Sequence, residues 1–490
     1  MALDPHTPVL VGVGVVQQRE EDPALAAEPL ELMARALERA AEDAGDRSLL
    51  SRAGEILLPR GFWDYADPGR ALADRFGASS ARSLVAEVGV LQTTLFGRAA
   101  AQIAEGRADV VLVTGGEAKY RSLRAKITGG EALLRETPGE PDTVMRPAGE
   151  IIHPLEMQHG IAMPVNCYAI MENALRFAEG QSVAEHRDSV AKLWAAMSDV
   201  AERNPDAWRR ERVAPAHVRD AADGNRMLAF PYTKLHNSQW NVDQAAGLVF
   251  ASVEAARAAG IPEDRWIFPW SVVESNHMTN LTVRKRLHRV PGFAHAGAKA
   301  LEHAGRKPDE IDHLELYSCF PMAVRAQCRE IGIPEDRPHT VTGGMAFAGG
   351  PLNNFVLQAQ ARMVQVLRGA AGSLGMVNAV SGFLTKQGVS LWSSEPPPRA
   401  FQYGDVSSET ERDVPILEIA EAAGANARIA GYTVLYEDDA PARAVFICDL
   451  EDGKRTLATC SDPTVARLGT EAELCGREVR LSEDGDVALA

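Results

Sequence analysis

The chain has 490 residues, of which 46% are hydrophobic and 24% are charged, and its formal net charge is −16. This length suits two or three domains, and this composition is ordinary for a globular protein. The acidic balance argues against nucleic acid or an anionic membrane as a partner of the whole surface. It leaves open a local basic pocket for a phosphorylated ligand.

The six cysteines are scattered, with no CxxC pair and no His/Cys spacing of the kind that binds zinc. Sparse, unpaired cysteine suits a reducing compartment. The N-terminal residues lack a basic region ahead of their short apolar run, and no window approaches a transmembrane length. We therefore expect a cytoplasmic protein without a signal peptide, a membrane partner or a metal.

Strands and helices are expected to alternate through the first 118 residues. Short β-branched runs predict strands at 8–18, 55–62 and 107–118, and amphipathic or small-residue runs that end in glycine predict helices at 29–45 and 93–106. The same order recurs after residue 292, with helices at 293–305 and 353–371 and strands at 310–320 and 373–383. Two diverged copies of one βα pattern predict an α/β fold with two parallel sheets, helices outside them and a shared central helix layer.

Three other regions differ from these halves in composition and sequence pattern. Residues 119–228 are rich in charge and helix formers, which predicts an inserted helical lobe, either covering a site at the sheet ends or purely structural. Residues 393–415 are rich in proline, serine and charge, as linkers are. Residues 416–490 contain short strand patterns, a hairpin turn at Asp452-Gly453 and one short helix, which predict a small OB-like β-barrel. The first half then comprises 1–118 and 229–270, and the second 271–392.

Four segments, in order and at roughly the right spacing, resemble motifs of the thiolase superfamily. They are AAAQIAEGRADVVLVTGGEA (99–118), NSQWNVDQAAG (237–247), IDHLELYSCFPMAVRAQ (311–327) and GGMAFAGGPLNNF (343–355). The resemblance implies a duplicated fold layered α-β-α-β-α over about residues 8–392. It also implies CoA or acyl-CoA as ligand, since thiolases make or break a carbon–carbon bond beside a CoA thioester. With its additional C-terminal β domain, the chain most resembles actinobacterial thiolase-like proteins.

The catalytic positions of the family carry different residues in this chain. Gly89 stands where the nucleophilic cysteine would be, and the first cysteine in the sequence is Cys167. Gly350 replaces the histidine of the GHP motif, and the segment of the second cysteine contains Asn378 and Ser381 instead. Because acyl transfer needs a thiolate and α-proton transfer needs a base, ordinary thiolase activity is not expected.

The resemblance places residues 317–320, YSCF, in a loop that helps form the family's oxyanion hole. A Tyr317 hydroxyl could donate a hydrogen bond to a thioester oxygen. Cys319 is a candidate catalytic thiol, but with no histidine close in sequence a buried structural cysteine is favoured. Thr93 and Thr94 offer hydroxyls near Gly89; no base is apparent, and helix capping is the favoured interpretation.

We expect the substrate pocket to be lined by residues from these loops: Gly89, Thr93, His236, Ser318, Gly349, Gly350 and Asn378. For His236 an internal hydrogen-bonded role is the alternative. Lys119, Arg121, Arg124 and Lys126 in the lobe are candidates for binding the CoA phosphates, because the adenosine phosphates of CoA usually meet the lobe in this family. A second basic cluster, Arg284–Arg286, is more simply a solvated surface.

Three functions fit these residues. The first is an acyl-CoA-binding protein with degraded or altered chemistry. The second is a retro-aldol lyase that uses Tyr317 on a β-hydroxyacyl-CoA, and the third is a non-catalytic protein that recruits a partner enzyme in lipid or steroid metabolism. A homodimer through the thiolase-like core and a monomer both remain open.

Overall fold

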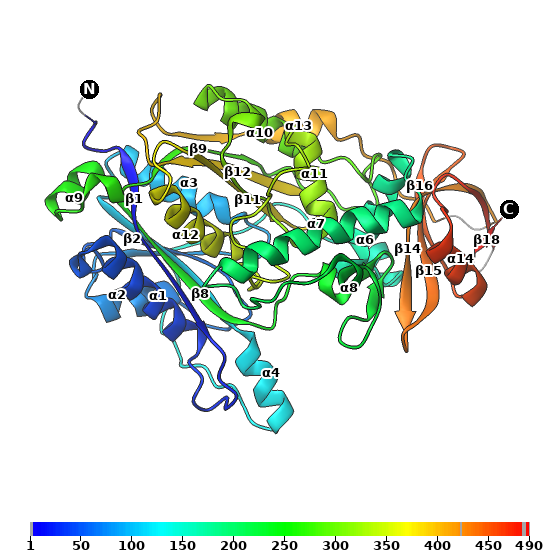
Figure 1. Cartoon of the computed structure of the whole chain (residues 1–490), viewed down its shortest axis with the longest axis horizontal. Helices are drawn as coiled ribbons and strands as arrows, with labels where there is room; N and C mark the ends of the chain where they lie inside the picture. Colours follow the sequence, from blue (N-terminus) through cyan, green and yellow to red (C-terminus); the bar gives the residue numbers. More distant parts are fainter. Residues whose placement is uncertain (1–2, 422–423, 483–486, 490) are drawn as a thin grey trace.

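The computed structural model describes residues 3–421, 424–482 and 487–489. Two sheets and the helices around them form one body, a helical lobe leads away from it, and a third sheet lies at the far end of the lobe (Figure 1). Within the described residues, no helix is both long and apolar enough to cross a membrane.

The first sheet has the strand order β1-β8-β4-β2-β3-β5. Its strands are β1 (Pro8–Gln18), β2 (Glu55–Pro59), β3 (Arg82–Ala86), β4 (Val110–Ala118), β5 (Thr143–Met145) and β8 (Asp243–Ser252). Every residue of β4 and β8 is buried, because helices cover both faces of the sheet. Strands covered on both faces read as continuous apolar runs, which is why the sequence pattern located β4.

The second sheet has the order β10-β11-β12-β9-β13. Its strands are β9 (Phe268–Ser275), β10 (His313–Glu315), β11 (Leu374–Ser381), β12 (Lys386–Ser393) and β13 (Gln402–Asp405). The run β9-β12-β11-β10 repeats the pairing directions of β1-β8-β4-β2: antiparallel, antiparallel, parallel. The expected duplication of one βα unit is therefore confirmed in the sheet topology. The expectation of parallel sheets was wrong, because β8 and β12 each run antiparallel to both of their neighbours.

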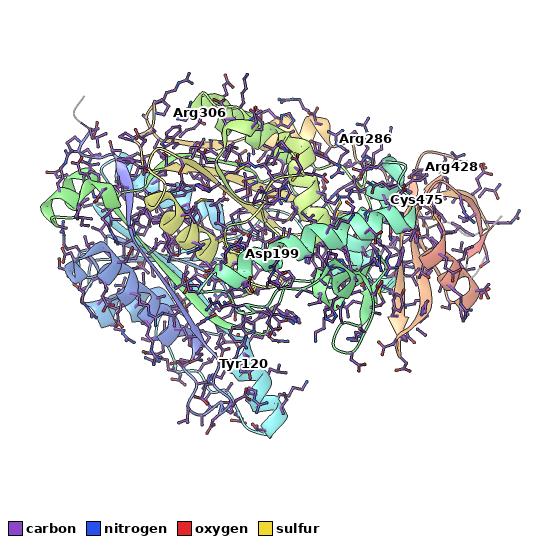
Figure 2. All side chains as sticks on the ribbon, in the orientation of Figure 1. Tyr120, Asp199, Arg286, Arg306, Arg428 and Cys475 are labelled. Carbon is purple, nitrogen blue, oxygen red and sulfur yellow. The ribbon has the colours of Figure 1, made fainter. Side chains whose placement is uncertain are left out.

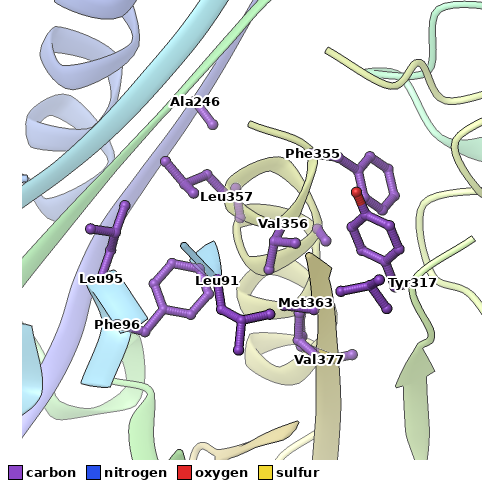
Figure 3. Packing of buried hydrophobic residues seen from close by; sticks show 14 of the residues in the cluster. Leu91, Leu95, Phe96, Ala246, Tyr317, Phe355, Val356, Leu357, Met363 and Val377 are labelled. Carbon is purple, nitrogen blue, oxygen red and sulfur yellow. The ribbon is translucent and has the colours of Figure 1, made fainter. Parts of the chain in front are cut away.

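The helices form layers on and between these two sheets. Those of the outer layers are α1 (Pro29–Ala44), α2 (Pro68–Phe76), α9 (Val253–Ala258), α10 (Pro291–Ala304), α11 (Pro321–Ile331) and α13 (Ser407–Asp413). The central layer consists of α3 (Gln92–Ala104) and α12 (Phe355–Arg368), whose apolar side chains, such as Phe96 and Leu357, fill the core between the sheets (Figure 3). This is the expected α-β-α-β-α arrangement.

The lobe and the third sheet are joined by shared structure. The lobe helices are α4 (Lys119–Thr128), α5 (Pro154–Gln158), α6 (Pro164–Ala178), α7 (Val183–Arg203) and α8 (Pro215–Arg219). The third sheet contains β14 (Asn426–Glu437), β15 (Ala440–Leu450), β16 (Arg455–Cys460), β17 (Glu478–Leu481) and β18 (Val487–Leu489), with α14 (Pro463–Glu471) packed on it. Two short strands from the end of the lobe, β6 (Met227–Ala229) and β7 (Tyr232–Thr233), extend this sheet through a pairing of β6 with β14.

Several segments differ from the sequence-based expectation. The sequence analysis placed no strand at β3, β5, β8, β9 or β12. It interpreted residues 393–415 as a linker, whereas β13 and α13 lie within them. The expected boundary at residue 270 falls inside β9, which pairs only within the second sheet. The Asp452-Gly453 turn does join a β15–β16 hairpin, with Gly453 at φ +83°. The pairing of the third sheet runs as an open path among the described residues, so its OB-like character stays a prediction.

Buried Glu315, at the end of β10, positions the loop that leads into α12. Its carboxyl oxygens accept hydrogen bonds of 2.8–2.9 Å from the hydroxyls of Thr340 and Thr342 and from the N–H groups of Val341 and Thr342. Burial raises the pKa of Glu315 to about 7, although these hydrogen bonds act in the opposite direction. One carboxyl group thus fixes the start of the glycine-rich loop at 343–350.

The raised pKa of Glu315 predicts a specific pH dependence of stability. The folded-state pKa of Glu315 lies above the ordinary value of 4.5. The contribution of this carboxyl group to the free energy of unfolding is therefore fully present below pH 4.5 and is lost as the pH rises through about 7. We expect the free energy of unfolding of the wild type, relative to E315Q, to fall by on the order of 3 kcal/mol between pH 5 and pH 8.

Urea denaturation of both proteins at several pH values measures this difference. E478Q is the matched control, because the Glu478 side chain is 72% exposed and the change should leave the pH dependence unaltered. If the free energies of unfolding of wild type and E315Q differ by the same amount from pH 5 to pH 8, the raised pKa of Glu315 is contradicted.

Strand β5 occupies the outer edge of the first sheet. Thr143–Met145 pairs in parallel with Leu84–Ala86 of β3, and Pro147 follows two residues after the strand ends. A very short edge strand followed by proline is a poor template for a second chain. We expect the protein to sediment as a monomer at micromolar concentration; a dimer that persists on dilution would show that this edge, or another surface, still associates.

Candidate functional site

The candidate site lies where the N-termini of the two central helices meet. At this point Gln92 Nε2, at the start of α3, donates a hydrogen bond of 2.8 Å to Asn353 Oδ1, just before α12. The contact links the two halves of the duplicated fold. The loops named in the sequence analysis lie around it, and hydrogen bonds and ring contacts connect most of them to one another.

Gly89 is buried in the loop between β3 and α3. Its φ of +105° is one that side chains other than glycine rarely adopt. A Cβ at this position would lie 2.7 Å from Pro147 Cγ and 3.6 Å from Ile151 Cδ1. The space that a side chain at residue 89 would need is therefore filled by the segment that follows β5.

The YSCF loop is tied to β11 by one glutamine. Gln327 on α11 accepts a hydrogen bond from the Tyr317 N–H at 3.0 Å and donates to the Tyr317 carbonyl at 2.9 Å. The same Oε1 accepts from Asn378 Nδ2 at 3.1 Å. The structure thus brings Tyr317 and Asn378 into one network, and Asn378 Oδ1 is left buried without a partner among the described residues.

The Tyr317 ring is buried but its hydroxyl is free to bind another group. The ring packs edge-on against Phe355 at the start of α12, with 6.2 Å between ring centroids (Figure 3). Within the described chain no hydrogen-bond partner is found for the hydroxyl, and burial raises its pKa further above the ordinary range. Tyr317 is therefore a neutral hydrogen-bond donor at physiological pH.

Ser318 and Gly350 hold the glycine-rich loop in place. Ser318 Oγ, completely buried, accepts a hydrogen bond from the Met345 N–H at 3.0 Å. The Gly350 N–H donates to the Gln239 carbonyl at 2.8 Å. A Cβ on Gly349, at φ +101°, would lie 2.2 Å from Gln244 Oε1, and one on Gly350 would lie 3.0 Å from the Ser238 Cβ. This loop is closely packed on both sides.

Cys319 lies beside a tyrosine that the sequence did not indicate. Burial raises the pKa of the Cys319 thiol to about 12, so it is protonated at neutral pH. Tyr168, from the lobe helix α6, stacks on Phe320 with centroids 4.4 Å apart, and its hydroxyl reaches the Gly382 carbonyl at 3.5 Å. Tyr168 is also close enough to Tyr317 and Cys319 that a negative charge on either would raise its pKa.

Thr93 and Thr94 bind a buried carboxyl group. Helix α3 has Leu91 as its N-cap and no side-chain capping bond, so the capping interpretation was wrong. The Thr93 hydroxyl instead donates to Glu274 Oε1 at 2.5 Å, Thr94 contacts both oxygens at 3.0 Å, and the Tyr403 hydroxyl donates to Oε2 at 3.1 Å. Burial raises the pKa of Glu274. The three hydroxyl groups supply the hydrogen bonds that this buried carboxyl group needs.

The other expected residues lie farther from these contacts. The His236 ring packs near Tyr232, its Nδ1 accepts from the Thr233 N–H at 3.1 Å, and burial lowers its pKa to about 3. Arg124 on α4 is ion-paired with Glu21 at 2.9 Å, and Lys126 is exposed on the same helix. No contact joins either cation to the glycine-rich loop among the described residues.

Buried amides are the feature of this site that the sequence analysis missed. Gln92 Oε1, Asn353 Nδ2 and both polar atoms of the Asn354 side chain lack partners within the part of the chain described. Buried polar atoms are normally satisfied, so unpaired ones indicate bound water or ligand. Gln92 gave no signal beyond a polar residue at a helix start. No group of three or more potential metal ligands occurs in the described residues.

No family model matches the chain. An acetyl-CoA acetyltransferase of Methanothermobacter thermautotrophicus is 23% identical over 251 residues, which are 46% of this chain and 62% of that protein. The 3-oxoadipyl-CoA/3-oxo-5,6-dehydrosuberyl-CoA thiolase of Escherichia coli is 34% identical over 112 residues, 22% of this chain and 25% of that one. The matches thus span less than two thirds of each curated relative.

Solved structures match over greater lengths. The monomeric SCP2-thiolase-like protein type 1 of Mycobacterium smegmatis superposes with a TM-score of 0.84 and 29% identity over 100% of both chains. The Ltp2-ChsH2(DUF35) aldolase has a TM-score of 0.60 and 17% identity, covering 80% of this chain and 99% of that one. The acetyl-CoA acetyltransferase of Syntrophomonas wolfei has a TM-score of 0.56 and 18% identity over 80% of this chain and 100% of the other. With its duplicated sheets and central helix pair, the chain belongs to the thiolase superfamily.

Proposed function

We propose that this protein binds CoA or an acyl-CoA at the junction of the two central helices and does not perform ordinary thiolase chemistry. The fold and the curated relatives, which are named for acyl-CoA reactions, support the choice of ligand. The departure from thiolase chemistry rests on the sequence: glycine occupies positions 89 and 350, and Asn378 stands on the strand of the second cysteine.

The observation that carries the proposal is a set of unpaired polar groups beside loops that lack a base. The Tyr317 hydroxyl and the buried Gln92, Asn353 and Asn378 amides can bind a thioester or pantetheine amide, and none of them titrates near neutral pH. The thiol of Cys319 is protonated, so it cannot act as a nucleophile there. These groups can hold and orient an acyl thioester without attacking it.

Calorimetric titration with CoA, acetyl-CoA and longer acyl-CoAs tests the proposal. We expect one site per chain and, for Y317F, an affinity for acyl-CoA about 2- to 10-fold weaker, because one hydrogen bond to the thioester is lost. Y436F, at a tyrosine on β14 in the third sheet, is the matched control and should bind as the wild type does. The absence of heat with every chain length would rule out acyl-CoA binding.

Restoring the family's catalytic residues should not restore thiolase activity. In G89C G350H, the new cysteine meets Pro147 and an unfavourable φ, and the new histidine meets Ser238 and Met345. We expect no thiolysis of acetoacetyl-CoA above the wild-type background, with thermal melts confirming that the variant is folded. Thiolase-like turnover by this variant would show that the segment at Pro147 can move to accommodate a side chain at position 89.

A second function is favoured by one observation, the pair of tyrosines beside Cys319. In a retro-aldol reaction the Cα–Cβ bond breaks to give a ketone and the enolate of an acyl thioester, and the β-hydroxyl proton ends on the α-carbon. In this proposal the Tyr168 and Tyr317 hydroxyls relay that proton, each donating its own as it accepts another, so that no separate base is needed. Cleavage of a β-hydroxyacyl-CoA that Y168F or Y317F abolishes, with acyl-CoA binding retained, would establish this activity.

A further inference from the structure

One buried lysine at the edge of the candidate site takes no part in the contacts described above. All nine lysines of the chain lie in the described residues, and Lys386 alone among them is buried, with 3% of its surface exposed. No hydrogen bond or ion pair of its ammonium group is found in that part of the chain. Burying an ammonium group without a partner costs free energy, which points to a role beyond packing.

The strand register places Lys386 on the face of the second sheet that carries the central helices. Lys386 begins β12 and lies directly opposite Ser381 of β11. Gly388, two residues farther along β12, packs on α3, because a Cβ there would lie 2.1 Å from Thr93 Oγ1. Residues two apart on a strand share a face, so Lys386 lies on the side of α3. Helix α10 covers the other face of β12, with Arg306 beyond its end at the outer surface (Figure 2).

The start of β12 adjoins the loops of the candidate site. The turn that leads into this strand contains Gly382, whose carbonyl accepts the hydrogen bond from Tyr168 at 3.5 Å. A Cβ on Gly382 would lie 3.5 Å from Ile151 Cγ2, and one on Gly89 would lie 3.6 Å from Ile151 Cδ1. One isoleucine thus lies beside both loops. Lys386 therefore stands next to the junction at which the acyl thioester is proposed to bind.

Two acids act on the Lys386 ammonium group without forming an ion pair with it. Glu274 of β9 lies opposite Gly388 and so shares the face of Lys386, and Asp405 lies on the neighbouring strand β13. Burial lowers the pKa of Lys386, and the charges of Glu274 and Asp405 oppose this shift. A lowered pKa increases the fraction of free amine, which is the nucleophilic form of lysine.

We infer that Lys386 is a covalent acylation site for the bound acyl thioester, an inference that rests on the proposed function. The free amine of Lys386 attacks the thioester carbonyl carbon, and a C–N bond forms as the C–S bond breaks. The proton that the nitrogen gives up ends on the sulfur, so the products are an Nε-acyl-lysine and CoA with a free thiol. The bound thioester supplies the acyl group, and no other reactant is needed. Holding both groups in one site raises their effective concentration.

Mass spectrometry of the full chain after incubation with deuterium-labelled acetyl-CoA tests the inference. The isotope separates new acyl groups from any that were acquired during expression. We expect Lys386 to be acylated at least about tenfold faster than any other lysine, because only this amine shares a site with the thioester. An excess of desulfo-CoA, which lacks the sulfur that carries the acyl group, should compete for the site and slow the labelling of Lys386 alone.

Two variants separate Lys386 from the exposed lysines. In K386M the main labelled position should disappear, and the fold should be retained because an apolar side chain of similar length replaces an unpaired buried cation. K192M removes an exposed lysine on α7 and should leave the labelling of Lys386 unchanged. Thermal melts check that both variants are folded.

Calorimetry with acetyl-CoA on the same preparations distinguishes failure of this inference from failure of the proposed function. If acetyl-CoA binds and Lys386 is labelled no faster than Lys192, the inference is overturned while the proposed function stands. Labelling of Lys386 that excess desulfo-CoA leaves unchanged would also overturn it. If acetyl-CoA does not bind and Lys386 is not labelled, both fail.

Discussion

The carboxyl group of Glu315 is the contact on which the arrangement of the candidate site depends. It ends β10, and it binds the hydroxyls and N–H groups that start the glycine-rich loop, so it sets the YSCF loop and the glycine-rich loop against each other. Ser318 and Gln327 then extend this order to Met345 and Asn378. A buried carboxyl that organises a loop is costly unless several donors satisfy it, and here four do.

Around this frame, close packing surrounds the positions that the sequence analysis aligns with catalytic residues of thiolases. Pro147 and Ile151 occupy the space beside Gly89, and Ser238 and Met345 lie against Gly350. The polar groups that remain are amides and phenols, which hold the same charge across the physiological pH range. These side chains suit the proposed binding of an acyl thioester, and the tyrosine pair beside Cys319 supports the second proposed function.

Much of the fold followed from the sequence, because buried strands and glycine-terminated helices leave strong periodic signals. The repeat of the βα pattern predicted the two duplicated halves, but not the strand order or the antiparallel pairs of either sheet. The motif spacing indicated Gly89, Gly350 and the loop of Tyr317 as candidate positions. Contacts between distant segments left no such signal. Nothing local pairs β5 with β3, places Tyr168 beside Cys319 or sets Glu274 against Thr93, since each contact is created only when the lobe or the opposite sheet folds onto the site.

The third sheet is built into the body of the protein. Its strand β14 pairs with β6 from the lobe, and the buried Arg455 donates to the carbonyls of Thr282, Arg284 and Lys285 in the second half. Backbone pairing with the lobe and the buried Arg455 side chain hold this sheet on two sides. It therefore cannot move relative to the rest of the protein as a flexibly linked domain does. Anything this sheet contributes to catalysis or recruitment must be contributed in place, and exchanging it between relatives would require the lobe and residues 282–285 to be exchanged with it.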